Sequence, residues 1–111
     1  MKVNAYHHGR GTVVVPRDAI VEGDCDELRQ AVGEALGNGS SQIVVDMDEV
    51  PFADSAGLEL LCELQATCTN SGACLKLASL GEVCSEILRI TDLAERFERF
   101  RTVEEAAKGL V

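Results

Sequence analysis

Apolar residues recur along the chain with two different spacings, and these spacings predict its elements. Residues 2–8 and 12–15 have the composition of strands, and the glycine-containing turn at 9–11 indicates that they form a hairpin. The run at 42–47 is apolar and rich in β-branched residues, which is typical of a central strand buried on both faces. Two further strands are predicted at 73–77 and 97–101.

The first two helices are predicted between these strands. One begins at Asp24 or Asp26, with acidic residues in its first turn as the helix dipole favours, and carries one apolar stripe. It ends before the Gly-Asn-Gly sequence at 37–39, a strong helix-terminating signal. The second is predicted at 55–70, where leucines and cysteines recur at helical spacing.

Two more helices are predicted in the C-terminal part of the chain. The third covers 81–90, and its apolar residues are expected to face inward: Val83, Cys84, Ile87, Leu88 and Ile90. A last helix is predicted from Thr102 to about Leu110, because Thr102 and Glu105 have the spacing of a capping box.

The resulting order is β-β-α-β-α-β-α-β-α over a single α/β domain covering residues 1–111. A β-strand, a helix and a parallel strand join by a right-handed crossover that folds the helix back onto the sheet. We therefore expect a mixed β-sheet with its helices packed mainly on one face.

Charge and composition narrow the possible functions. The formal net charge is −9, which argues against binding nucleic acid, since that requires clustered Lys and Arg. No apolar run approaches the length of a membrane span and no signal-peptide segment is visible, so no membrane insertion and a cytoplasmic location are expected. The five cysteines include no closely spaced pair, so neither a metal site nor another cofactor site is predicted.

The sequence Asp54-Ser55-Ala56-Gly57 lies where the apolar strand at 42–47 gives way to the second helix. A hydroxyl at this position sits among free backbone N–H groups at the positive end of the helix dipole, a setting that favours an anion. It could carry a phosphate. It could equally be an ordinary helix cap, although Asp54 alone could supply the capping oxygen.

Three segments resemble the STAS domain, the sulphate transporter and anti-sigma-factor antagonist family, and specifically its small bacterial anti-sigma factor antagonists. The strand with Asp54-Ser55-Ala56-Gly57 and Leu58 looks like the family's phosphorylation segment. Residues 75–78 are similar to the strand before the third helix. Residues 88–93, followed by Phe97, Phe100, Thr102, Glu105 and Ala106, look like the family's C-terminal end.

The resemblance implies a binding protein that sequesters an anti-sigma factor with serine kinase activity and so releases a sigma factor for transcription. The kinase would phosphorylate Ser55 and break the complex, and a phosphatase would restore it. The implied partner-binding residues are Asp54, Ser55, Ala56, Gly57, Glu22 and Phe52, with Gly57 expected to let a partner approach closely.

Two positions depart from the family pattern. The residue after the acceptor is often Ser or Thr in the family and is Ala56 here, which leaves a single hydroxyl. The family commonly has an Asp on the loop after the second strand, where this chain has Val21 with Glu22 beside it.

Two other functions are possible for such a chain. An enzyme would need a base near Ser55, but both histidines lie in the first strand and no G-x-S-x-G sequence occurs, so no enzymatic activity is expected. The alternative is a soluble STAS subunit that regulates a membrane transport system, with the same serine-containing loop as its docking surface.

Overall fold

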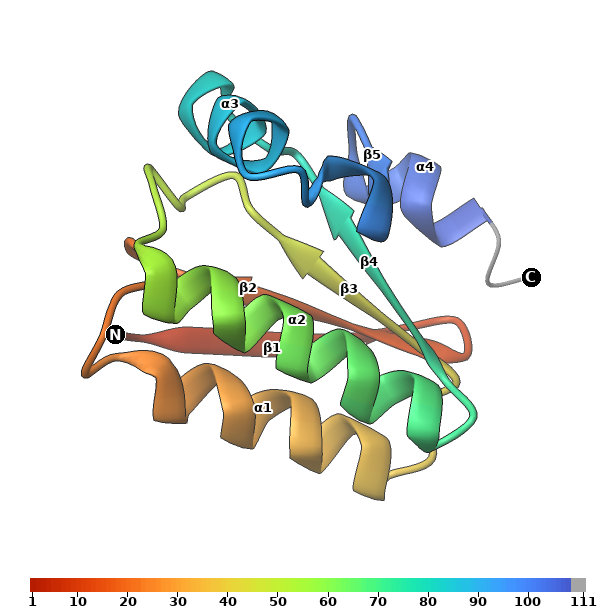
Figure 1. The fold of residues 1–111 in the computed structure, drawn as a ribbon. Coiled ribbons are helices and arrows are strands. Elements are labelled where there is room, and N and C mark those ends of the chain that lie inside the picture. The colour runs from red at the N-terminus through yellow and green to blue at the C-terminus, as the bar shows by residue number, and fades with distance from the viewer. Residues whose placement is uncertain (109–111) are drawn as a thin grey trace.

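Five strands lie side by side in the order in which they occur in the chain, in a computed structural model that describes residues 1–108 (Figure 1). They are β1 (Val3–His8), β2 (Gly11–Pro16), β3 (Gln42–Asp46), β4 (Cys74–Ala78) and β5 (Glu98–Phe100). β1 and β2 form the antiparallel hairpin, and the remaining neighbours pair in parallel. The predicted mixed sheet and the order of its elements are therefore confirmed.

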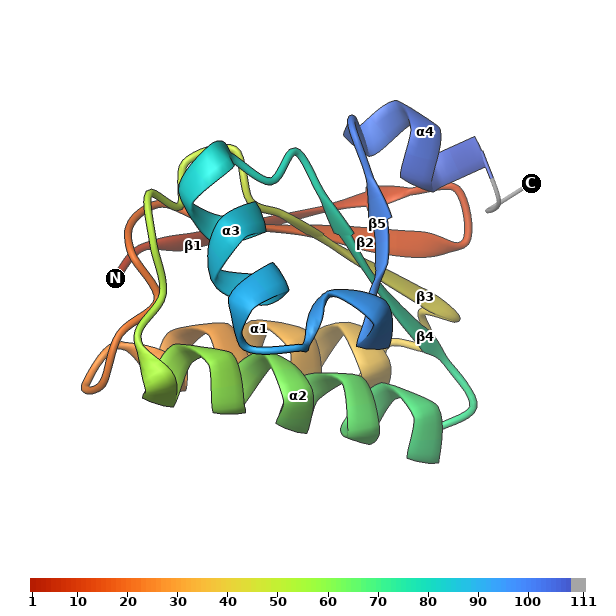
Figure 2. The ribbon, with the colours of Figure 1, turned by 45° about the horizontal axis from the view of Figure 1, so that its top comes forward.

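Three helices cover one face of the sheet. α1 (Cys25–Gly37) and α2 (Ser55–Asn70) lie next to each other across it, and α3 (Glu82–Ile90) packs against the same core (Figure 2). A 3₁₀ turn, η1 (Ala94–Arg96), follows α3. The short helix α4 (Val103–Ala107) lies on the other face, so most helices share one face as expected. The predicted end of α4 near Leu110 lies outside the described residues.

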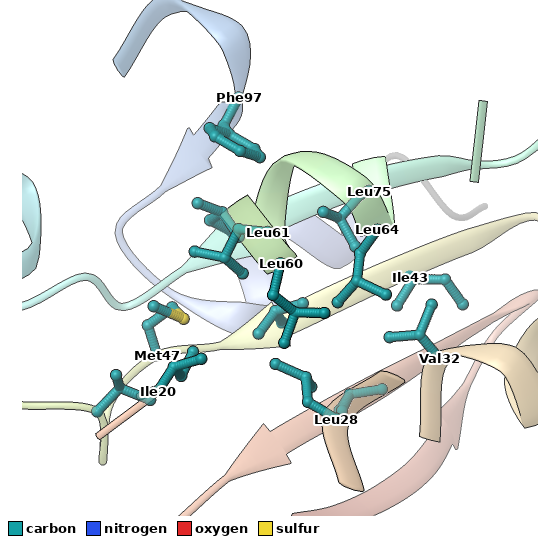
Figure 3. Close-up of a cluster of buried hydrophobic side chains, with 14 of the residues drawn as sticks. Ile20, Leu28, Val32, Ile43, Met47, Leu60, Leu61, Leu64, Leu75 and Phe97 are labelled. Carbon is teal, nitrogen blue, oxygen red and sulfur yellow. The ribbon is translucent and has the colours of Figure 1, made fainter. Parts of the chain in front are cut away.

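The main core fills the space between α1, α2 and the sheet. Alternate residues of the central strands face this side, because successive side chains of a strand point to opposite faces. Figure 3 shows leucines of α1 and α2 converging on these strands. The labelled residues of this cluster include Leu28, Val32, Ile43, Leu60, Leu61, Leu64 and Leu75. Burial of these side chains holds both helices against the sheet and fixes the position of the α2 N-terminus.

A smaller core joins α4 to the opposite face of the sheet, where Val44 and Ala78 pack against Ala106. Lys76 of β4 is buried on this face. Its Nζ donates a hydrogen bond to the Ala106 carbonyl oxygen at 3.2 Å and lies 5.2 Å from the centroid of the Phe100 ring. The ammonium group thus has a partner at the C-terminal end of α4, where the helix dipole favours a cation.

The prediction for α3 is wrong at two positions. Cys84 and Leu88 are buried as expected, but Val83 is 55% exposed and Ile90 is 63% exposed. The apolar residues of this helix cover a wider arc than the sheet and α2 can contact, so part of the arc faces solvent.

Within the described residues, no helix combines the length and apolarity needed to cross a membrane.

Candidate functional site

The Asp54 carboxylate joins two parts of the chain that are far apart in sequence. Asp54 is the N-cap of α2, and its Oδ1 accepts a hydrogen bond from the Gly57 N–H at 2.9 Å. Its Oδ2 accepts a second hydrogen bond from the Glu22 N–H, in the loop before α1, at 3.0 Å. One side chain therefore caps the helix and holds the neighbouring loop against it.

These hydrogen bonds keep Asp54 ionised. The backbone N–H of Glu22, followed by that of Gly57, lowers the pKa of the Asp54 carboxyl below its ordinary value of 3.8, because both donors stabilise the charged form. A fixed negative charge therefore lies directly before Ser55 at neutral pH.

A backbone contact fixes the same loop a second time. Ile20 forms a parallel bridge with Ala53, in which the Ile20 N–H donates to the Phe52 carbonyl oxygen at 3.1 Å. The Asp54 N–H in turn donates to the Ile20 carbonyl oxygen at 3.2 Å. The start of α2 is thus attached to the segment that follows β2 by backbone hydrogen bonds as well as by the Asp54 side chain.

Gly57 is the residue that makes this close contact possible. It is buried, and a Cβ atom at this position would lie 2.0 Å from the Ile20 carbonyl oxygen. We expected Gly57 to leave room for a partner. In the structure the missing side chain leaves room for Ile20 of the same chain, so the fold itself requires a glycine at position 57.

Ser55 is exposed and is the first residue of α2. Within residues 1–108 its hydroxyl has no hydrogen-bond partner, because Asp54 supplies the capping oxygen. The sequence left open whether Ser55 caps α2 or could carry a phosphate. In the structure Asp54, not Ser55, caps the helix. The Ser55 hydroxyl remains accessible at the helix end that favours an anion.

The other expected site residues differ in their exposure and contacts. Ala56 is partly exposed beside it, and Phe52 is 47% exposed in the connection that precedes Asp54. Glu22 is exposed, and it is its backbone N–H, not its carboxylate, that contacts Asp54. Met47, an apolar residue of the same connection, is buried in the core.

A shallow groove runs from Ser55 along α2. One side is formed by α2 residues including Leu58, Glu59 and Cys62, and the other by residues after α3: Thr91, Leu93 and Arg96. Neither this second side nor the Ile20 contact was predicted. No local signal in the sequence could reveal them, since both depend on how distant segments pack.

Comparison with known proteins identifies the family of this chain. The model of the STAS domain family matches residues 2–106. The chain belongs to the STAS domain family. This confirms the resemblance drawn from its three sequence segments.

Three relatives illustrate the range of similarity. The anti-sigma-F factor antagonist RsfB of Mycobacterium tuberculosis is 28% identical over 85 residues, which cover 75% of this chain and 67% of RsfB. The structure of an anti-sigma factor antagonist from Mycobacterium paratuberculosis superposes with a TM-score of 0.85 at 20% identity, covering 98% of this chain and 92% of that one.

The third is the Bacillus cell fate determinant SpoIIAA in its phosphorylated form, with a TM-score of 0.74 at 14% identity, covering 99% of this chain and 100% of that one. At these identities the two solved structures show a shared fold.

Proposed function

We propose that this chain is an anti-sigma factor antagonist whose binding is switched by phosphorylation of Ser55. In its unphosphorylated form it binds an anti-sigma factor that is also a serine kinase, and thereby releases a sigma factor. The observation that carries the proposal is the exposed, unbonded Ser55 hydroxyl beside a helix start that Asp54 already caps. Phosphorylation at that position disturbs no hydrogen bond among residues 1–108.

The chemistry requires only groups that the proposal names. The kinase transfers the γ-phosphoryl group of ATP to Ser55 Oγ, so that an Oγ–P bond forms, the bond to the leaving ADP breaks and the hydroxyl proton is lost. A phosphatase reverses the modification by adding water across the Oγ–P bond. The domain itself contributes the acceptor and its setting, and it needs no catalytic residue.

The effect of the phosphate follows from its surroundings. It adds about −1.5 to −2 charges and three acceptor oxygens next to the ionised Asp54 carboxylate. The free N–H groups and dipole of α2 make this charge tolerable within the domain. In a docked complex the same charge would lose its hydration and repel acidic groups of a partner. The switch is therefore local and leaves the fold unchanged.

Phosphate mapping tests the acceptor. The chain is incubated with ATP and each anti-sigma factor encoded in the same genome, and phosphate is located by mass spectrometry. We expect one phosphate on Ser55 and none in Ser55→Ala. Ser85→Ala, at another exposed serine, serves as the matched control and keeps the phosphate. A phosphate mapped elsewhere, or none from an anti-sigma kinase that binds the chain, would rule out the switch.

Binding measurements separate this function from the transport alternative. We expect the unphosphorylated chain to bind an anti-sigma factor in isothermal titration calorimetry and the phosphorylated chain to bind it at least tenfold more weakly. A chain that binds no anti-sigma factor but copurifies with a membrane transport protein would instead support a transport subunit.

A further inference from the structure

Large apolar side chains are exposed at few places in the described part of the chain, and most of them lie on α3 or on the connection that precedes Ser55. Four residues form this set: Tyr6, Phe52, Val83 and Ile90. Tyr6 lies on β1, whereas Phe52 precedes α2 and the other two belong to α3. Single exposed apolar residues need no explanation, but a group of them on adjoining elements indicates a binding surface.

The connection that carries Phe52 touches the start of α3. The Cys84 thiol donates to the Val50 carbonyl oxygen at an Sγ–O distance of 3.4 Å. Figures 1 and 2 both show this connection beside α3. The connection that carries Phe52 therefore lies against the first turn of α3, although 30 residues separate Phe52 from Glu82 in the sequence.

The apolar side of α3 is linked to the groove at Ser55 through Leu58 of α2. Val83, Ile87 and Ile90 are spaced by four and three residues and so share one side of the helix. Ile87 lines a small hollow together with Leu58 of α2, and Leu58 also lines the groove that contains Ser55. The apolar side of α3 is thus continuous with the phosphorylation site.

Three acidic side chains border this surface, together with the basic side chain of Arg96 in the Ser55 groove. Glu82 belongs to the first turn of α3, Asp92 lies two residues after the end of α3, and Glu59 lines the groove beside Ser55. None of these three carboxylates forms an ion pair with another residue in the range 1–108. They can therefore pair with cationic groups brought by another molecule, and a partner with acidic groups at these positions would be repelled.

We infer that Phe52, Val83, Ile87 and Ile90, called here the α3 surface, bind an apolar segment of the partner protein that is flanked by Lys or Arg side chains. This inference rests on the proposed function and assigns the contact that gives the complex its affinity. Ser55 lies at the edge of that contact. A phosphate there keeps water and negative charge beside an apolar surface that must be dehydrated for binding, which weakens the complex.

The test uses the anti-sigma factor that binds the unphosphorylated chain in the titrations described above. Val83→Ser and Ile90→Ser are each expected to weaken binding about tenfold, and the double variant about a hundredfold, as for anchoring residues of an interface. Ile90→Leu should bind like the original chain because it keeps the apolar side chain. Circular dichroism melting checks that each variant is folded.

Two exposed residues provide matched controls for position. Phe52 and Tyr6 are both 47% exposed aromatic residues, one within the α3 surface and one on β1. Phe52→Ser should weaken binding about tenfold, whereas Tyr6→Ser should leave it unchanged. Glu59→Gln should weaken binding about twofold and reduce its dependence on NaCl concentration, since it removes one charge from the acidic border.

The outcomes separate this inference from the proposed function. If no anti-sigma factor binds the unphosphorylated chain, both are overturned. If one binds, and Val83→Ser and Ile90→Ser bind it as tightly as the original chain, the α3 surface is overturned while the proposed function stands. If Tyr6→Ser weakens binding as much as Phe52→Ser, the contact is not confined to the α3 surface and the assignment fails.

Discussion

α2 and α3 both follow a parallel strand of the sheet, yet their N-termini are held in different ways. The N-cap of α2 is Asp54, whose side chain bonds to two backbone N–H groups, while Gly57 lies against the backbone at Ile20. The N-cap of α3 is Gly81, which has no side chain to offer. The start of α2 is fixed by several independent contacts, and that of α3 by few.

The two helices also differ in how much of their apolar surface is buried. α2 has 16 residues and buries five of them, whereas α3 has nine residues, buries Cys84 and Leu88, and exposes Val83 and Ile90. A fixed helix start positions a modifiable hydroxyl reproducibly. An apolar side left uncovered provides contact area for a partner. The start of α2 thus suits the proposed switch, and the uncovered side of α3 suits the proposed contact area.

Replacing Gly57 should have the largest effect on the fixed region. Gly57→Ala places a methyl group 2.0 Å from the Ile20 carbonyl oxygen, so α2 must move away and its hydrogen bonds to the loop must break. We expect the free energy of unfolding to fall by about 4 kcal/mol, measured by urea denaturation.

Gly33→Ala is the matched control for that variant. Gly33 lies inside α1, where a Cβ would meet no atom within 4 Å. The same substitution should there raise the free energy of unfolding by about 0.5–1 kcal/mol, because alanine is the better helix former. If Gly57→Ala and Gly33→Ala lowered the free energy of unfolding by similar amounts, the contact between Gly57 and Ile20 would be unimportant for stability.

Removing a buried side chain of α3 should have the next largest effect. Leu88 is 2% exposed, and Leu88→Ala should lower the free energy of unfolding by about 3 kcal/mol through lost burial and a new cavity. Ile90→Ala, two residues later at a position 63% exposed, should change it by no more than about 0.5 kcal/mol. If both variants lost the same unfolding free energy in urea denaturation, the distinction between a buried and an exposed side of α3 would be contradicted.

Much of the fold could be predicted because local patterns and global packing agree. The β-branched run of β3, the Gly-Asn-Gly sequence at the end of α1 and the Thr102 cap each mark an element that the structure contains. The exposure of Val83 and Ile90 could not be predicted. Helical spacing shows which residues share a side of a helix, but it does not show how much of that side a neighbour covers.

The site was predictable in part for a similar reason. A polar helix start after a buried strand is a local signal, so Asp54 and Ser55 could be singled out. Gly57 was recognised, but its role was not, because Ile20 is 37 positions away and its contact depends on the bridge to Ala53. The groove opposite α2 likewise depends on where the chain passes after α3.

Neutralising Asp54 should have a smaller, pH-dependent effect. The folded state lowers the pKa of this carboxyl below 3.8, so its ionised form adds stability above that pH, and the contribution is lost as the pH falls through the folded-state value. Asp54→Asn should therefore lower the melting temperature at pH 7, and its difference from the original chain should shrink towards pH 3.

Asp24→Asn provides the comparison at another N-cap. Asp24 is the N-cap of α1 and forms no side-chain capping hydrogen bond; its Oδ1 contacts only the Met1 amino group, at 3.4 Å, among the described residues. This variant should therefore lower the melting temperature at pH 7 less than Asp54→Asn does. A loss in Asp54→Asn that is equally large at pH 3 and pH 7 would contradict the role given to the charged carboxylate.

Ser55→Asp should change stability least while still weakening binding. The added carboxylate gains from the positive end of α2, loses a similar amount through repulsion from Asp54, and breaks no hydrogen bond within the described structure. We expect the free energy of unfolding to change by less than about 0.5 kcal/mol in urea denaturation, while affinity for the anti-sigma factor falls about tenfold. Ser55→Ala should leave both nearly unchanged. If Ser55→Asp instead unfolds the domain, the start of α2 cannot accommodate a charge. A phosphate there could not then act as a local switch.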